Sequence, residues 1–364
     1  MIGYITINDE TNLGNRLQSY ATYQLLSRYD KTECIVRNYF CEGIKRRIPW
    51  NPLRIIKKLR SKISYKMFPN AEHQSTYEES RYLNFKEFSR LIHDGEILTK
   101  DTDYSQLENK YDIFVAGSDQ IWNPNLFSDM YINMLGFVKT KRKISLSSSI
   151  SKDNLYIEEK YEFKKYLNSF YALSCREEKG SCLVRKLTHK DCETLIDPTL
   201  MLEKNEWDSI MRKPDFHDEK KEYILLYFLG ERTKELNDEI SEFGKKYNIE
   251  IIDIYDKESL YYSCGPREFL YLINNASLVL TDSFHACVFS FMYNKSFVVH
   301  DRNWNNCNMN SRLETLLKKF HLERKYANSG LENDIWEHNY EDGYKQLELE
   351  RQKATEFLKK ALDC

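Results

Sequence analysis

The sequence predicts an α/β protein with two domains, each built around a parallel β-sheet. Three observations lead to this prediction. Strand-like and helix-like segments alternate along most of the chain, 364 residues suit two domains of ordinary size, and a charged stretch at 212–222 separates two such series. We place the N-terminal domain at 1–210, the C-terminal domain at 211–330, and a C-terminal helical segment at 331–364.

The N-terminal domain is predicted from short apolar runs that end in polar residues. Its first unit is a strand at 4–8, a polar loop at 10–15 and an amphipathic helix. The apolar face of this helix holds Leu17, Tyr20, Ala21, Leu25 and Leu26. Further strands are expected at 33–39, 112–116, 143–150, 171–175 and 194–196, with helices at 157–167 and after residue 178.

The C-terminal domain repeats the alternation. Its strands are expected at 223–229, 249–254, 278–281 and 297–299, and its helices at 234–247, 266–274 and from residue 283 onward. Such alternation indicates a parallel sheet with helices on both faces. The last periodic segment, 340–362, is a long helix that we expect to pack across the domain junction.

The glycine content excludes two common nucleotide-binding motifs. The chain has 12 glycines, and no two of them lie within ten residues of each other. Both the dinucleotide fingerprint G-x-G-x-x-G and the P-loop need clustered glycines to bring the backbone close to phosphates. The sequence is therefore not that of a classical NAD enzyme or a P-loop kinase.

Charge and cysteine content exclude further classes. With 54 Lys and Arg against 56 Asp and Glu, the net charge is −2, so we expect no nucleic-acid partner. The nine cysteines are never closer than seven residues, and neither C-x-x-C nor H-E-x-x-H occurs, so no metal site is predicted. No apolar run approaches the roughly 20 residues of a membrane span, and the N-terminus lacks the features of a secretory signal. We expect a cytoplasmic protein with reduced thiols.

A basic stretch interrupts the N-terminal domain. Residues 43–71 contain nine Lys and Arg and no acidic residue, and Ile55, Ile56, Leu59 and Ile63 recur among them at helical spacing. A cationic amphipathic helix of this kind either lies on an anionic membrane surface or is a solvated helix packed on its own domain. The first interpretation places the protein at the inner face of the plasma membrane.

The strongest candidate site follows the strand at 278–281. In parallel sheets, ligands bind beyond the carboxyl ends of the strands, and between two such domains we expect them in the central cleft. Here Asp282, Ser283 and His285 follow the strand. Ser283 is placed to cap a helix, which puts His285 beside unpaired N–H groups that favour an anion. The alternative is a capping box with a buried structural histidine.

Four other polar segments lie at strand ends or helix starts. Arg176 either grips a carboxylate or pairs with Glu177 or Glu178, and Asp119 is either a base or part of an Asx turn. Around these residues, the candidate ligand contacts are Asn12, Gly14, Asn15, Arg16, Gly117, Ser118, Gln120 and Arg312.

Taken in order, these segments resemble the polysaccharide pyruvyl transferase family. The resemblance runs from about residue 3 to residue 322. Its specific blocks are Gly-Ser-Asp-Gln-Ile-Trp-Asn at 117–123 and Thr-Asp-Ser-Phe-His at 281–285. Supporting blocks lie at 12–21, 174–178, 197–200, 265–270 and 310–313.

The resemblance implies a fold and a reaction. The fold is a glycosyltransferase-B-like pair of Rossmann-type domains that face a central cleft. The donor is phosphoenolpyruvate, the acceptor is a sugar of a surface glycan or its lipid-linked precursor, and no cofactor is implied. A pyruvate ketal bridges two hydroxyls of the sugar, and phosphate leaves. Carried over by position, the family histidine is His285 and the family arginine is Arg176.

The resemblance also leaves roles open. We expect His285 to donate a proton, Arg176 to clamp the carboxylate, the helix start at Ser283 to hold the phosphate, and Asp119 or Asp282 to act as base. Many members carry Arg where this chain has Ser283, and a glycine often stands where it has Ala286. The Ser-x-Gly segment expected near 148–150 ends here in Ile150. The alternatives are a nucleotide-sugar glycosyltransferase of the same architecture and a non-catalytic glycan-binding relative.

Overall fold

The computed structural model describes most of the chain. Its described residues are 1–37, 77–99, 101–127, 130–152, 154–302, 311–327, 333–336 and 338–363. The basic stretch at 43–71, predicted to form a helix, lies outside them. Within these described ranges, no helix is both long enough and apolar enough to cross a membrane.

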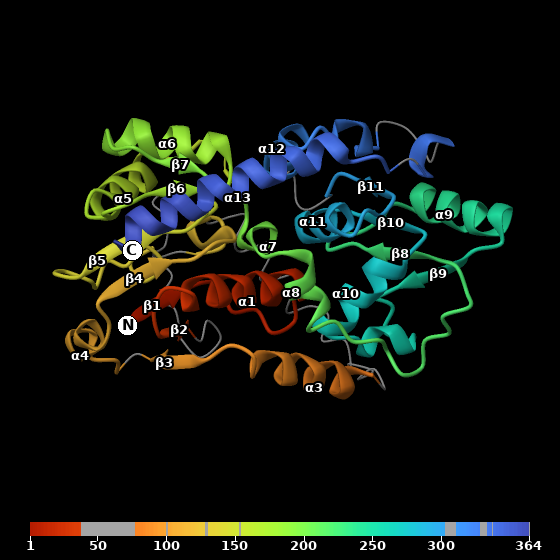
Figure 1. The fold of residues 1–364 in the computed structure, drawn as a ribbon, viewed down its shortest axis with the longest axis horizontal. Helices are drawn as coiled ribbons and strands as arrows, with labels where there is room; N and C mark the ends of the chain where they lie inside the picture. Colours follow the sequence, from red (N-terminus) through yellow and green to blue (C-terminus); the bar gives the residue numbers. More distant parts are fainter. Residues whose placement is uncertain are drawn as a thin grey trace, which may run out of the picture.

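The N-terminal domain is built on a five-stranded parallel sheet of order β3-β2-β1-β4-β5 (Figure 1). β1 pairs with both β2 and β4, so the strand order reverses there, as in Rossmann-like folds. The strands are β1 (Ile2–Ile5), β2 (Thr32–Arg37), β3 (Asp94–Leu98), β4 (Ile113–Ala116) and β5 (Arg142–Ser145). The helices around them are α1 (Leu13–Ser27), α4 (Tyr104–Lys110), α5 (Ile157–Leu167) and α6 (Glu178–Thr188).

Beyond β5, the sheet continues into a short parallel pair, β6 (Ser174–Cys175) and β7 (Glu193–Thr194). The N–H of Ser145 donates to the carbonyl of Ala172 at 3.1 Å, which joins this pair to β5. The predicted strand at 143–150 is therefore too long. The chain turns after β5 because Ser147 has a φ of 52°, which is incompatible with a strand.

The C-terminal domain contains a second parallel sheet, of order β11-β10-β8-β9. Its strands are β8 (Tyr223–Tyr227), β9 (Glu250–Asp253), β10 (Leu278–Thr281) and β11 (Phe297–Val299). The helices that follow them include α9 (Lys234–Tyr247), α10 (Pro266–Asn275), α11 (Phe284–Met292) and α12 (Ser311–Lys319). Short 3-10 turns lie at η1 (Gln120–Trp122), η2 (Leu260–Ser263), η3 (Glu323–Lys325) and η4 (Asn333–Trp336). The predicted class, two Rossmann-like parallel-sheet domains in a glycosyltransferase-B-like pair, is confirmed.

A continuous apolar core joins the two domains. The predicted boundary at 210–211 follows α7 (Pro198–Met201) and α8 (Lys204–Asp208), two short helices that lie between the sheets. Trp207 of α8 packs on Tyr20 of α1 and on Phe289 of α11, with ring centroids 5.7 and 5.0 Å apart. Because one core contains residues of both domains, their contact is extensive and apolar.

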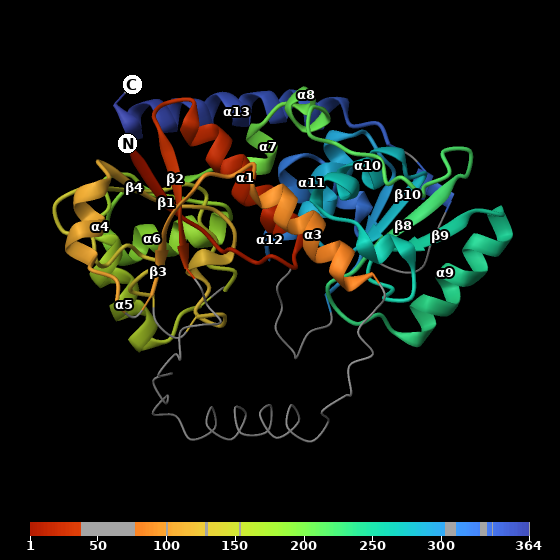
Figure 2. The ribbon, with the colours of Figure 1, turned by 90° about the horizontal axis from the view of Figure 1, so that it is seen from below.

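Two further helices cross between the domains (Figure 2). α3 (Glu78–Ser89) follows in sequence the N-terminal strand β2, yet Arg81 Nη1 donates to the carbonyls of Tyr262 (2.8 Å) and Cys264 (3.0 Å) in the C-terminal domain. α13 (Glu341–Leu362) runs in the opposite sense, from the C-terminal domain back over the N-terminal one. The long terminal helix thus packs across the junction, as predicted.

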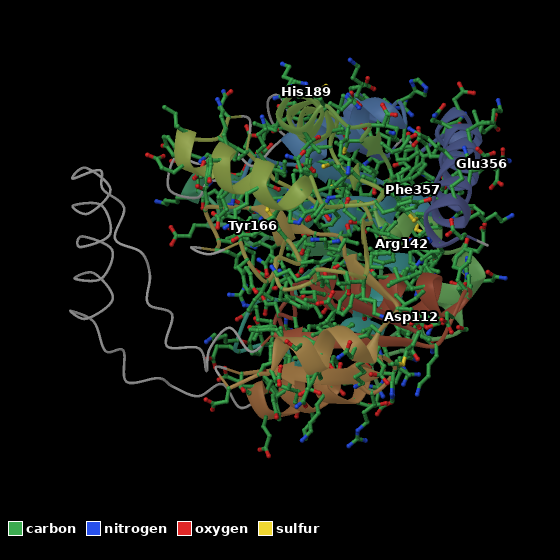
Figure 3. The ribbon with its side chains drawn as sticks, turned by 90° about the vertical axis from the view of Figure 1, so that its left-hand side faces the viewer. Asp112, Arg142, Tyr166, His189, Glu356 and Phe357 are labelled. Atoms are coloured by element: carbon green, nitrogen blue, oxygen red, sulfur yellow. The ribbon has the colours of Figure 1, made fainter. Side chains whose placement is uncertain are left out.

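The contacts of α13 span its whole length. Near its middle, Glu350 accepts from Lys319 of α12 at 2.8 Å, and Arg351 Nε donates to the carbonyl of Leu200 at 2.8 Å. At its end, Arg142 Nη1 donates to the carbonyl of Ala361 at 3.2 Å. Figure 3 faces this end of the molecule and shows Arg142 beside α13. The helix therefore fixes the two domains against each other.

Candidate active site

The helices that follow β1 and β10 meet in direct contact at their first turns. Gly14, in the first turn of α1, lies against the ring of His285, which is in the first turn of α11 after β10. A Cβ placed at Gly14 would lie 2.5 Å from Nδ1 of His285 and 2.6 Å from its Cβ. Such separations are closer than real Cβ contacts, so only glycine allows this approach.

The start of α1 is fixed by its own asparagines. The side chain of Asn12 accepts from the N–H of Asn15 at 3.0 Å and so caps the helix. Asn15 in turn accepts from the N–H of Asp9 at 2.9 Å and donates from Nδ2 to Oδ2 of Asp119 at 2.9 Å. Asn12 therefore fixes the start of the helix, and Asn15 ties it to Asp119 after β4.

The segment after β4 holds Asp119 in an unusual conformation. Its φ of 62° is uncommon for a residue with a side chain. The carbonyl of Asp119 accepts from the N–H of Ser149 at 2.8 Å, which fixes this geometry against the serine segment. A strained backbone that aims a carboxylate at the domain junction is typical of a functional site.

The neighbours of Asp119 support the segment. The N–H of Gly117 donates to the carbonyl of Ile5 at 2.7 Å, and a Cβ at Gly117 would lie 3.1 Å from that oxygen. Ser118 Oγ lies within hydrogen-bond distance of the carbonyl of Ser147 (3.0 Å) and of Asp197 Oδ2 (2.9 Å). Gln120 accepts from Asn123 at 2.7 Å, so its amide is used within its own turn.

Arg176 is bound by two carboxylates. Its side chain is buried, and Nη1 donates to Asp197 Oδ2 at 2.6 Å while Nη2 donates to Asp119 Oδ1 at 3.3 Å. The guanidinium also lies 4.3 Å from the ring centre of Phe284, a cation–π contact. The alternative pairing with Glu177 or Glu178 is wrong. Glu177 instead accepts from the N–H groups of residues 150 and 151, and Glu178 pairs with Arg185.

Asp197 is a site residue to which the sequence analysis gave no role. It is 0% exposed, lies directly before α7 as its N-cap, and accepts from the N–H (3.0 Å) and hydroxyl (2.7 Å) of Thr199. Asp197 caps α7 and Pro198 is its first residue, which is a common pattern at the start of a helix and accounts for these two bonds. Only the structure shows that its other oxygen receives Arg176 and Ser118.

His285 faces Asp197 across the domain junction. Its Nε2 lies 3.9 Å from Asp197 Oδ1 and, among the described residues, has no hydrogen-bond partner. Burial lowers the pKa of His285, and Arg176 and Arg312 lower it further, whereas Asp197 and Asp119 raise it. The net effect is a lowered pKa, so His285 is neutral at pH 7 in the free protein.

Arg312 completes the group. It lies in the first turn of α12, is 6% exposed, and its Nη1 lies 3.7 Å from Asp119 Oδ1. Burial and the charge of Arg176 lower the pKa of Arg312 to about 9, although Asp119 raises it. The lowering shows that the nearby carboxylate does not fully offset the cost of burying this guanidinium.

We call Arg176, His285 and Arg312 the cationic cluster. Each has one buried nitrogen that lacks a partner among the described residues: Nε of the two arginines and Nε2 of the histidine. Burial alone would raise the pKa of Asp119 and Asp197, but the cluster outweighs it and lowers both. Both carboxylates are therefore ionised, and the unpartnered nitrogens are available to an incoming anion.

Asp282 and Ser283 lie beside the cationic cluster but have other partners. The carboxylate of Asp282 accepts from the N–H groups of Leu229 and Gly230, both at 2.8 Å, and from Arg302 Nε at 3.2 Å. Ser283 occupies the N-cap position of α11, but its side chain forms no capping hydrogen bond. Its N–H donates to Thr281 Oγ1 at 2.9 Å instead. The predicted capping by Ser283 is therefore correct in position only.

The described part of the chain contains no group of three or more His, Cys, Asp or Glu side chains arranged to hold a metal ion. The ionisable side chains that the structure brings together at the site are two carboxylates, two guanidinium groups and one imidazole.

The chain was compared with known proteins in sequence and in structure. The sequence model of the polysaccharide pyruvyl transferase family matches residues 12–302. No curated protein matches the chain in sequence. Among solved structures, the UDP-GlcNAc 2-epimerase from Neisseria meningitidis bound to UDP-GlcNAc is similar, with 11% identity, 98% and 99% of the two chains covered, and a TM-score of 0.48. Arabidopsis thaliana UGT89C1 complexed with UDP-L-rhamnose is similar with 14% identity, 98% and 94% coverage, and a TM-score of 0.46.

Proposed function

The chain belongs to the polysaccharide pyruvyl transferase family, and we propose that it transfers the pyruvyl group of phosphoenolpyruvate to a sugar of a surface glycan or its lipid-linked precursor. The product is a pyruvate ketal across two sugar hydroxyls, and phosphate leaves. No cofactor enters the proposed reaction. The observation that carries the proposal is the cationic cluster, in which three buried nitrogens lack partners at the junction of the two sheets.

The site can gain one positive charge when an anionic donor binds. With His285 neutral, the two arginines are balanced by Asp119 and Asp197, so the site as a whole carries no excess charge. A bound phosphate raises the pKa of a neighbouring imidazole. In our proposal, the donor therefore binds together with a proton on His285, and the imidazolium adds a third cation beside the phosphate.

The proposed reaction requires two proton transfers, and we assign both to His285. The first sugar hydroxyl adds to C2 of phosphoenolpyruvate, its proton is lost, and one proton is gained by the methylene carbon, which becomes the methyl group. The second hydroxyl then displaces phosphate, and its proton leaves on the phosphate. A histidine that changes charge when the donor binds is suited to both transfers.

The carboxylates have a supporting role in this proposal. Asp119 is a weak base because the cluster lowers its pKa, and it holds Arg176 and Asn15 in place. The carboxylate of Asp282 is used by two N–H groups and Arg302. Either residue as base for the acceptor hydroxyl remains a prediction, and we favour His285 for proton transfer. Asn12, Gly14, Gly117 and Ser118 shape the donor site through the contacts given above.

The test is ligand binding followed by turnover. Phosphoenolpyruvate at about 100 times its dissociation constant should stabilise the protein by about 2.7 kcal/mol, which a melting experiment detects. The shift should disappear in Arg312→Met, in which an arginine of the cluster becomes a neutral side chain of similar length. A response to a UDP-sugar but not to phosphoenolpyruvate would support a glycosyltransferase instead. Binding of glycan without any release of phosphate would indicate a non-catalytic relative.

We also propose that the basic stretch at 43–71 holds the protein against the anionic cytoplasmic face of the membrane. The support is its sequence, nine cations without an acidic residue among helically spaced apolar residues. Lipid-linked acceptors at that surface would then be close to the site.

A further inference from the structure

Arg16 belongs to the sequence block at 12–21, but it has no contact with the cationic cluster among the contacts described above. In 12–16, Asn12 caps α1, Gly14 allows His285 to approach, and Asn15 binds Asp119. Arg16 follows directly and is 2% exposed. Its contacts differ from those of every neighbour in the block.

The guanidinium of Arg16 is buried without a carboxylate. Nη1 donates to Oδ1 of Asn8, while Nε is buried and has no partner within the part of the chain that the structure describes. No Asp or Glu oxygen of those residues forms an ion pair with it. The charge of Arg16 acts on Asp94 without an ion pair between them. It lowers the pKa of Asp94, although burial outweighs this effect and raises that pKa overall.

Two other buried arginines of this protein have more partners than Arg16, although each also has one buried nitrogen without a partner among the described residues. Arg176 binds two carboxylates, and Arg81 donates to two carbonyls and contacts three aromatic rings. Burying a guanidinium against one neutral amide is costly because the lost hydration is not replaced by a countercharge. A buried guanidinium with an unpartnered nitrogen and no countercharge is expected at an anion-binding site without its ligand.

We propose that Arg16 forms a second anion-binding subsite, which takes a carboxylate or phosphate group of the substrate that occupies the cationic cluster. Successive side chains of an α-helix point about 100° apart. Arg16 therefore points in a different direction from Asn15, which reaches Asp119, and its guanidinium lies against Asn8. The positive end of α1 adds to the attraction of an anion there.

The proposed function supplies a ligand with two anionic groups, and the inference rests on it for the identity of the ligand only. Phosphoenolpyruvate carries a carboxylate and a phosphate ester on the same carbon, C2. One group at the cationic cluster and the other at Arg16 would fix its orientation. Arginine suits either group because its planar fork matches both geometries.

The experiment compares Arg16→Met with Arg28→Gln by calorimetric titration. Met keeps the length and apolar stem of the side chain and removes the charge. Arg28 lies at the end of the same helix, is half exposed and pairs with Glu206, so its variant controls for changes in α1. Each protein is titrated with phosphoenolpyruvate and, separately, with inorganic phosphate, and its melting temperature is measured without ligand.

We expect Arg16→Met to weaken phosphoenolpyruvate binding about tenfold to a hundredfold, the effect of losing charge-assisted hydrogen bonds, while Arg28→Gln binds as the wild type does. If phosphate binding is unchanged, Arg16 takes the carboxylate. If it weakens in parallel, Arg16 takes the phosphate. Without ligand, the melting temperature of Arg16→Met should not fall, since an uncompensated buried charge has been removed.

Unchanged affinity for both probes would overturn the inference, as would a lower melting temperature with normal affinity, which indicates that Arg16 only holds Asn8. Failure of the wild type to bind phosphoenolpyruvate would contradict the proposed function instead. The phosphate titration would then still decide whether Arg16 binds an anion.

Discussion

Gly14 and His285 come from different domains and are in contact, with a Cβ at Gly14 placed 2.5 Å from Nδ1 of the imidazole. The missing side chain of one residue thus determines how closely the other can approach α1. Because Asn15 binds Asp119 and His285 faces Asp197, this contact lies beside both carboxylates of the site.

Gly14→Ala should disrupt the site more than the fold. Alanine favours a helix by about 1 kcal/mol over glycine, which offsets part of the roughly 1–3 kcal/mol cost of a forced contact. The added methyl must displace His285, so we expect turnover to fall at least about tenfold, as a misplaced reacting group does. Phosphate release and thermal unfolding measure the two effects. Gly180→Ala is the control, since that helical glycine lies against Glu177 and not His285. Equal losses in both variants would contradict the prediction.

The pH dependence of stability should reflect the histidines. Burial lowers the pKa of His285, His300 and His217 below the usual value of about 6.5. The unfolded chain therefore binds more protons than the folded chain as the pH falls below about 6.5, so the free energy of unfolding should decrease there. Chemical denaturation between pH 5 and pH 8 measures it, and His285→Gln should flatten the slope. A slope unchanged in that variant would mean that His285 does not contribute.

Donor binding should take up a proton. The phosphate of phosphoenolpyruvate is expected to raise the pKa of His285, which is neutral in the free protein at pH 7. Calorimetric titrations in two buffers of different ionisation enthalpy give the number of protons bound. We expect uptake of a fraction of one proton by the wild type and close to none by His285→Gln. Equal uptake in both would assign the proton to another group.

Membrane contact should depend on the charges of the basic stretch. Each Lys or Arg near an anionic surface contributes about 1 kcal/mol, so replacing Lys57, Lys58, Arg60 and Lys62 by Gln should weaken binding to anionic vesicles at least about a hundredfold. Vesicle sedimentation measures it. The control replaces Lys234, Lys245 and Lys246 of α9, which are exposed and should have little effect. Unchanged binding after the first replacement would exclude this stretch as the contact.

The fold was predictable where one physical rule decides the local structure. The buried strands β10 and β11 and the helices α5 and α9 lie at the predicted residues because their apolar runs or periodicity are unambiguous. β3 was missed because it is a largely exposed edge strand. α3 was missed because the face that it buries includes Arg81, a charge that no apolar pattern places inside a protein.

The site was predictable residue by residue but not as a set of pairs. Positions after strands identified Asp119, Arg176 and His285, and the structure brings them together with Arg312. The structure also shows why residue 14 is a glycine: the ring of His285 lies where a side chain would be. The partner of Arg176 was assigned to its neighbours in sequence, although Asp197 lies 21 residues away. The sequence around Asp197 is that of a helix cap, which alone would account for an aspartate there. It therefore gives no reason to expect that Asp197 also binds Arg176.

Asp197 should therefore be important for stability and for the proton affinity of His285. In Asp197→Asn, Arg176 loses its shortest ion pair inside the protein. Breaking a buried pair from one side costs about 3–5 kcal/mol, and we expect the lower end of this range because Arg176 keeps Asp119 at 3.3 Å. The same change removes a carboxylate that raises the pKa of His285, so that pKa should fall further. Urea unfolding measures the first effect, and NMR titration of the imidazole the second.

Two further variants separate charge from packing at this position. Thr199→Val removes one hydrogen bond to the same carboxylate and keeps its charge, so it should cost about 1 kcal/mol and leave the pKa of His285 unchanged. In the double variant Asp197→Asn with Arg176→Met, neither buried charge remains, and part of the lost stability should return. If the double variant is as unstable as the sum of its single changes, the two residues are not coupled, and Asp197 acts only as the cap of α7.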